Sequence, residues 1–204
     1  MRPFAPAVIV AALATLASLF VVEPAFAHQQ VGLAGGFISG FSHPIFGPDH
    51  LIAMVAVGLW GAQLGNPGIW VLPITFPLVM AFGGLLGVLG VPFPSVEPVI
   101  AASAIVLGGV VALRVRAPFI VAAGLVGVFA VFHGYAHGAE LPAAANPVAY
   151  GVGFVLATGL LHLTGILIGL LIAWPLGERV VRACGVLIAV LGCYFLYAQF
   201  GATA

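Results

Sequence analysis

The sequence predicts an all-α membrane protein, a six-transmembrane helix bundle that follows a cleaved signal peptide. The composition is the first reason: 63% of the 204 residues are hydrophobic and only 5% are charged, whereas a soluble domain carries about 25% charged residues. The apolar runs are the second reason, because they are long enough to cross a bilayer. They are also continuous rather than alternating, which argues against a β-barrel.

The N-terminal 27 residues have the three parts of a secretory signal. Arg2 gives the positive start, residues 7–22 form the apolar segment, and Ala25 and Ala27 flank a small-x-small cleavage site. We therefore predict two parts of the chain, a signal peptide at 1–27 and a transmembrane domain at 28–204.

Proline, glycine and charged residues divide the rest of the chain into apolar segments. The predicted spans are 48–65, 69–90, 96–113, 117–139, 148–174 and 179–200, each close to the twenty residues that a crossing helix needs. Residues 31–42 are apolar, short and rich in glycine. We expect them to form a re-entrant or interfacial piece, or a part of the first span.

The arginines give an independent test of orientation. A cleaved signal places the mature N-terminus outside, and six spans then place the third and fifth connections inside. Those connections hold every arginine of the mature chain, namely Arg114, Arg116, Arg179 and Arg182. The positive-inside rule therefore agrees with the signal peptide. Together they predict a bacterial inner-membrane protein with periplasmic N- and C-termini.

Ionisable residues inside membranes are costly and are functional candidates by default. The first group is HPIFGPDH at 43–50, at the outer start of the first predicted span. Its prolines and glycine are expected to prevent a continuous helix, and the kink is expected to return His43 toward Asp49. His50 and Met54 lie on one helix face. Two imidazoles with a carboxylate suit a borderline divalent metal.

The second group is FHGYAHGAE at 132–140, which closes the fourth predicted span on the same outer side. His133, His137 and Glu140 are spaced i, i+4 and i+7, which places them on one helix face. A single membrane histidine is more often a hydrogen-bonded core residue. Two such groups on the same side favour metal handling instead.

Four other residues are weaker candidates for a metal pathway. Glu97 begins the third span, and taken alone it indicates an interfacial or capping residue. His162, near the middle of the fifth span, indicates either a deeper step along a path or a structural hydrogen bond. His28 offers its ring and a free amine after cleavage, or belongs to a disordered terminus. Phe76 indicates packing on pattern alone.

At the two histidine motifs the chain resembles the HupE/UreJ family of bacterial membrane proteins. That family is marked by His-x5-Asp-His in the first span and by Phe-His-Gly-x-Ala-His-Gly-x-Glu in the fourth, and both motifs are complete here. The resemblance implies nickel uptake, or cobalt uptake in some members, for hydrogenase and urease maturation. It implies a metal-handling set of His43, Asp49, His50, His133, His137 and Glu140. It also implies functional positions at Glu97 and Phe76.

The main hypothesis is a passive or secondary permease for Ni²⁺ or Co²⁺, and not an enzyme. Its expected partners are the divalent ion, the lipid bilayer, metallochaperones on the cytoplasmic side and further copies of itself. No prosthetic group is expected, and no nucleic acid, because the chain has no basic patch. Two alternatives stay open. One is an intramembrane metal-dependent hydrolase with a catalytic zinc, and the other is a b-type haem protein with axial His50 and His137.

Overall fold

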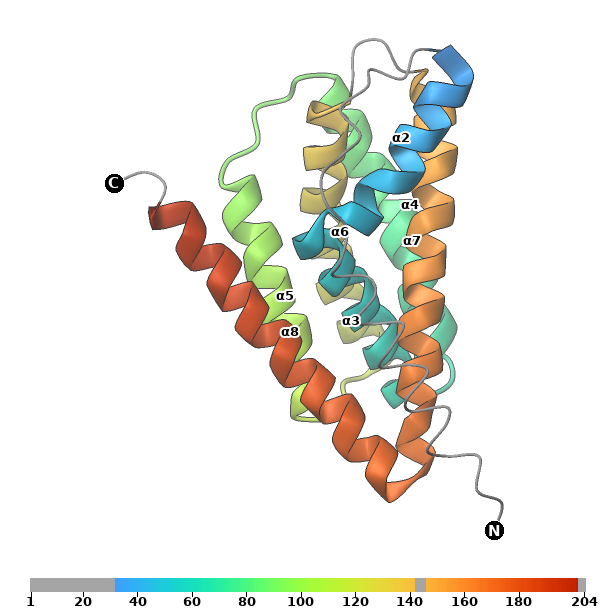
Figure 1. Cartoon of the computed structure of the whole chain (residues 1–204), viewed down its shortest axis with the longest axis vertical. Coiled ribbons are helices and arrows are strands. Elements are labelled where there is room, and N and C mark those ends of the chain that lie inside the picture. The colour runs from blue at the N-terminus through green and yellow to red at the C-terminus, as the bar shows by residue number, and fades with distance from the viewer. Residues whose placement is uncertain (1–31, 142–145, 202–204) are drawn as a thin grey trace.

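The computed structural model describes residues 32–141 and 146–201, and within these ranges every regular element is a helix (Figure 1). The helices are α2 (Gly32–Phe46), α3 (Pro48–Leu64), α4 (Gly68–Val88), α5 (Val96–Ala112), α6 (Phe119–Ala139), α7 (Pro147–Gly169), a 3-10 turn (Leu170–Ala173) and α8 (Pro175–Gly201). The predicted all-α class is confirmed. The predicted signal peptide and His28 lie outside the described residues.

Each of the six predicted spans coincides with one helix, from α3 to α8. Four of them are long and apolar enough to cross a membrane: α4, α6, α7 with its 3-10 turn, and α8. Helices α2 and α3 are long and apolar enough only when they are taken together, as a pair that is bent by 77°. Helix α5 is apolar, but its 17 residues make it shorter than these spans. A count of six spans therefore requires α2 and α3 to form one broken span and α5 to cross. It stays a prediction.

The expectation that the first motif interrupts the helix is confirmed, because α2 and α3 are bent by 77° at Gly47. The interruption is short, since α2 continues through Pro44 to Phe46. An internal proline removes one backbone hydrogen bond, which a helix packed inside a membrane bundle tolerates. From Gly32 onward, the apolar residues predicted at 31–42 form the first part of α2, which is 15 residues long. Both predicted forms, a re-entrant piece and a part of the first span, fit the bent α2–α3 pair.

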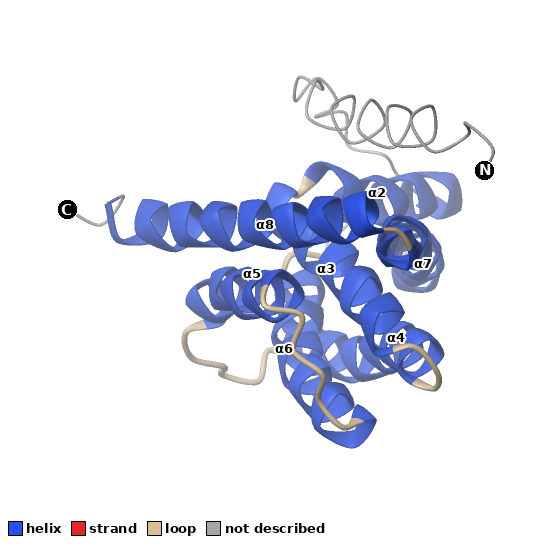
Figure 2. Ribbon diagram, turned by 90° about the horizontal axis from the view of Figure 1, so that it is seen from below, coloured by secondary structure: helices blue, strands red, loops and turns tan. Residues whose placement is uncertain are grey.

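Helix α3 lies at the centre of the bundle, with the other helices around it (Figure 2). Every residue from His50 to Ala62 is buried, as expected for a helix that is apolar on all sides. Helices α2 and α3 pack on α7, α4 packs on α6, and α5 packs on α8. Helix α8 runs obliquely and leans away from α7 toward its C-terminal end (Figure 1).

Glycines allow several of these helix pairs to approach closely. A Cβ atom at Gly83 would collide with the Val131 carbonyl, and one at Gly165 would collide with the Val55 carbonyl. The small-xxx-small spacing thus marks the α4–α6 and α3–α7 contacts. Gly65 serves the backbone conformation rather than helix packing. It ends α3 with a φ of 68°, which favours glycine, and a Cβ atom there would meet nothing within 4 Å.

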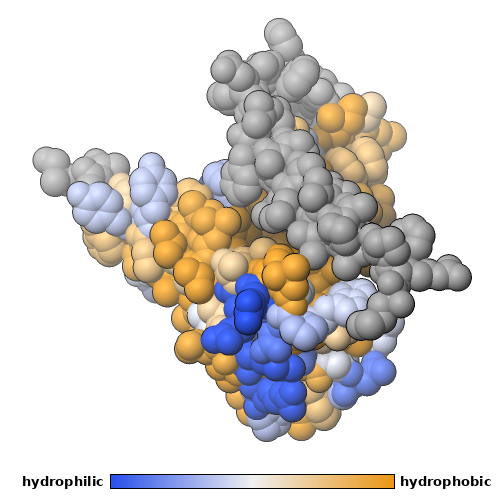
Figure 3. All heavy atoms as spheres, turned by 60° about the horizontal axis from the view of Figure 1, so that its bottom comes forward, coloured by the Kyte–Doolittle hydropathy of each residue, from blue (hydrophilic) through white to orange (hydrophobic). Residues whose placement is uncertain are grey.

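Polar side chains tie the helices together at one end of the bundle. Arg114 Nη1 donates to Glu178 Oε1 at 2.9 Å, which joins the α5–α6 connection to the start of α8. Arg182 Nε donates to the Ala112 carbonyl at the C-terminus of α5. Hydrophilic residues gather at this end, which faces forward in Figure 3. The two arginine-bearing connections therefore lie together, as the orientation argument requires.

Candidate metal centre

Four histidines from three helices meet near the other end of α6. His43 comes from the last turn of α2, His50 from the first turn of α3, and His133 and His137 from the C-terminal part of α6. The His137 ring centroid lies 4.3 Å from that of His50 and 4.8 Å from that of His43, and the His50 and His133 centroids are 5.2 Å apart. The bend between α2 and α3 turns His43 back to the same place. The two motifs are thus brought together, as predicted.

Three of these rings are arranged as a metal site requires. One ligand atom each from His43, His50 and His137 lies within 4.8 Å of the other two. Nitrogens bound at about 2.1 Å in the tetrahedral geometry of zinc lie about 3.4 Å apart. The three rings would therefore move together by about 1.4 Å at most to bind one ion. His50 and His137 are buried, and His43 is half-buried.

The buried ring nitrogens lack the partners that core histidines normally have. Among the described residues, neither nitrogen of His137 has a hydrogen-bond partner, and neither does Nε2 of His133. His133 Nδ1 donates to the Phe129 carbonyl at 3.0 Å. Metal-ligating histidines are commonly held in this way, with one nitrogen on a carbonyl and the other free. The cluster therefore has the character of a cation site.

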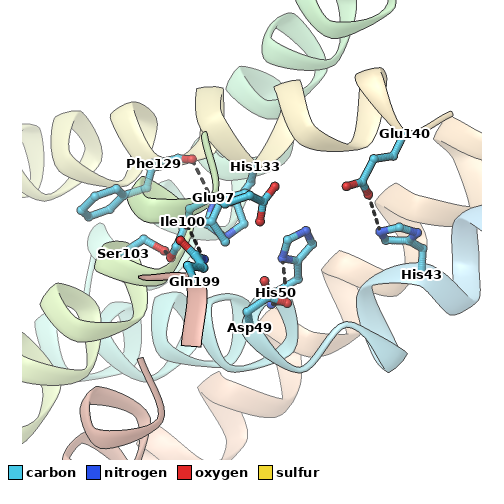
Figure 4. Close-up of polar contacts among 10 residues, drawn as sticks. All are labelled: His43, Asp49, His50, Glu97, Ile100, Ser103, Phe129, His133, Glu140 and Gln199. Carbon is cyan, nitrogen blue, oxygen red and sulfur yellow. Dashed lines mark hydrogen bonds and ion pairs between the residues drawn. The ribbon is translucent and has the colours of Figure 1, made fainter. Parts of the chain in front are cut away.

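Carboxylates flank the imidazoles (Figure 4). Asp49 Oδ1 accepts the His50 backbone N–H at 3.0 Å and lies 3.2 Å from His50 Nδ1. Glu140 Oε2 lies 3.7 Å from His43 Nε2. The Glu97 carboxylate, from the first turn of α5, lies on the His133 side of the cluster in the same view. Glu97 and Glu140 are exposed, so negative charge lines the approach to the buried rings and favours a cation.

The weaker candidates take separate positions. Phe76 is fully buried, and its ring centroid lies 5.4 Å from that of His133 and 5.4 Å from that of His162. It therefore contacts both histidines, although its pattern indicated packing alone. Met54 is fully buried one turn after His50 and belongs to the hydrophobic core.

Sequence reasoning singled out His162 but missed three other residues on the same face of α7. The Phe154 ring centroid lies 4.2 Å from that of His137, and the Tyr150 ring lies 6.4 Å from that of His43. Thr158 and His162 continue the same spacing of four residues, and all four side chains are buried. The i, i+4, i+8, i+12 spacing of these residues was the signal that could have revealed this face.

Comparison with known proteins agrees with the motifs. A family model described as "HupE / UreJ protein" matches residues 15–195. A relative named "Protein HupE", from Rhizobium leguminosarum bv. viciae, is 44% identical over 183 residues, which cover 89% of this chain and 95% of the relative. No solved structure matches the chain.

Proposed function

This chain belongs to the HupE/UreJ family, and from that premise we propose that it is an inner-membrane permease for Ni²⁺, with Co²⁺ as the second substrate. One observation carries the proposal: three imidazole ligand atoms from α2, α3 and α6 converge within 4.8 Å. Imidazole combined with carboxylate suits borderline divalent ions of this kind.

Uptake begins at the carboxylates. Glu97 and Glu140 are exposed, whereas the rings behind them are half-buried or buried. A hydrated dication is attracted by the negative charge and then exchanges water for imidazole nitrogens in stages, first at His43 and then at His50 and His137. The ion must be bound weakly enough to leave again. Asp49 supports this exchange by holding His50 in place.

The membrane potential can drive the ion inward. Each elementary charge gains about 2.3 kcal/mol per 100 mV, so a dication gains about 4.6 kcal/mol. The chain contains no lysine, and so it has no P-loop to hydrolyse ATP. We therefore propose passive or secondary transport, with delivery of the ion to metallochaperones for hydrogenase or urease maturation.

Reconstitution in liposomes tests this function. The purified protein is incorporated with a metal-sensitive dye inside, and Ni²⁺ or Co²⁺ is added outside. We expect rapid dye response with the unmodified protein and at least a tenfold slower response with Asp49→Ala and with His137→Ala. Cys193→Ala, on an exposed position of α8, is the matched control and should transport normally.

The same preparations separate the permease from the alternatives. Full uptake by both site variants would remove the cluster from the pathway. Tightly retained zinc at one ion per chain, together with hydrolytic activity, would instead indicate a metallohydrolase. A Soret absorption band would indicate haem bound by the histidines.

A further inference from the structure

Helix α7 carries buried polar groups beyond the histidine cluster. Tyr150, Thr158 and His162 lie on one face of this helix, and all three are buried. Among the described residues, the Tyr150 hydroxyl, the Thr158 hydroxyl and both ring nitrogens of His162 have no hydrogen-bond partner. Such groups are costly in an apolar interior. Their alignment along one helix therefore needs an explanation other than packing.

His162 lies on the inner side of the cluster. Helix α7 starts beside His43, where Tyr150 packs, and ends at the arginine-bearing end. His162 is twelve residues further along than Tyr150, which is about 18 Å in an α-helix. The His162 ring contacts Phe76, and Phe76 contacts His133 of the outer cluster. A continuous row of rings thus leads from the cluster to His162.

A structural hydrogen bond accounts for one nitrogen of His162 at most. In the described part of the chain, neither ring nitrogen meets a partner at regular hydrogen-bond geometry, and the ring is 1% exposed. The backbone carbonyl of Pro73 is close enough to interact with one nitrogen of the ring. This carbonyl lacks its usual helical donor, because residue 77 is a proline and has no N–H. It can support the ring from one side while the other nitrogen stays free, which is how His133 is held by Phe129.

We propose that His162 and the Thr158 hydroxyl form a second coordination site for the transported dication, on the inner side of Phe76. The proposal rests on the permease function and adds its inward step. The two residues lie one turn apart on the same face of α7. The inner site offers one imidazole and one hydroxyl, whereas the outer site offers three imidazoles and neighbouring carboxylates. Weaker binding at the inner site favours release to the cytoplasm.

Transport by matched variants is the first test. In the liposome assay we expect His162→Gln to lower the initial rate at least tenfold and Thr158→Ala to lower it two- to fivefold. Thr164→Ala should transport normally, because Thr164 is on the same helix but its hydroxyl already donates to the Leu160 carbonyl. Binding of Ni²⁺ at the outer cluster should be unchanged in all three. A normal rate with His162→Gln would overturn the inner site and leave the permease intact.

Spectroscopy of bound Co²⁺ is the second test and does not depend on transport. His162→Cys is made in a Cys184→Ala, Cys193→Ala background and titrated with Co²⁺ in detergent. Coordination at this position should produce a thiolate-to-cobalt charge-transfer band, whereas Thr164→Cys in the same background should not. Monodisperse elution in size-exclusion chromatography shows that each variant is folded. A missing band in folded His162→Cys would overturn the inner site even if Asp49→Ala abolishes uptake.

Discussion

At the residue scale, the histidine cluster can hold a dication or protons but not both. An imidazole ligates a metal only when it is neutral, so binding competes with protonation. The four rings form a chain of contacts, from His43 through His137 and His50 to His133, and neighbouring rings repel each other when both are charged.

Uptake should therefore fall as the outer medium is acidified. Protonation converts the neutral ligands to cations, so we expect the initial rate of Ni²⁺ uptake to fall as the outer pH is lowered from about 7. The decrease should be steeper than for a single proton, because several rings must be neutral together. Initial rates are measured in liposomes at a fixed internal pH. A rate that is constant or rises on acidification would contradict imidazole ligation.

The polar part of the site could be predicted from the sequence, and the aromatic part could not. His43, His50, His133 and His137 are conspicuous in a chain with few ionisable residues, and the predicted order of the spans placed both motifs at one end. An apolar ring in an apolar helix has no such contrast. The pattern of Phe76 therefore indicated packing, and only the family resemblance marked it before its contacts with His133 and His162 were known.

At the element scale, glycines determine how closely the ligand-bearing helices approach. Helix α6 carries His133 and His137 and packs on α4 through Gly134, where a Cβ atom would collide with the Met80 carbonyl. Gly124 lies on the same helix, but a Cβ atom there would meet nothing within 4 Å. The two positions differ in their neighbours and not in their helix.

Substitution by alanine should separate these two glycines. Gly134→Ala forces α4 and α6 apart, and we expect it to destabilise the protein by about 1–3 kcal/mol, as overpacking does elsewhere. Gly124→Ala should be neutral or slightly stabilising, because alanine has the higher helix propensity. Thermal unfolding in detergent measures both. Equal stability of the two variants would show that the α4–α6 contact does not depend on Gly134.

The boundaries of the helices were predictable to different degrees. Pro147 and Pro175 begin α7 and α8, where a missing N–H costs nothing. The start of α7 agrees with the span predicted from 148, whereas α8 begins four residues before the predicted start at 179. The continuation of α2 through Pro44 was not predicted. It depends on α7, because a Cβ atom at Gly40 would collide with the backbone of Tyr150. Tertiary contact of this kind overrides the local preference of proline.

At the scale of the whole molecule, two polar ends are separated by apolar helices. The histidine cluster lies toward the C-terminus of α6, whereas Arg114 and Glu178 join the connections at the opposite end. A crossing by α5 is the most demanding part of this topology. Its 17 residues span about 25 Å at 1.5 Å per residue, which is shorter than a hydrocarbon core of about 30 Å.

Cysteine labelling tests the six-span topology at the two points where it is weakest. Four exposed positions are replaced one at a time in a background without the native cysteines, and intact cells are treated with a membrane-impermeant maleimide. Leu33→Cys and Pro92→Cys should react, whereas Asn66→Cys and Arg116→Cys should react only after the membrane is disrupted. Leu33 and Asn66 bracket the bent α2–α3 pair, and Pro92 and Arg116 bracket α5.

Each pair of positions has its own contradicting result. Labelling of Leu33→Cys and Asn66→Cys from the same side would make α2 and α3 a re-entrant loop rather than a broken span. The histidine cluster would then be reached from one side without a crossing at that point. Labelling of Pro92→Cys and Arg116→Cys from the same side would show that α5 does not cross. Opposite labelling in both pairs would place the cluster outside and the arginines inside, which is the arrangement that inward movement of a cation requires.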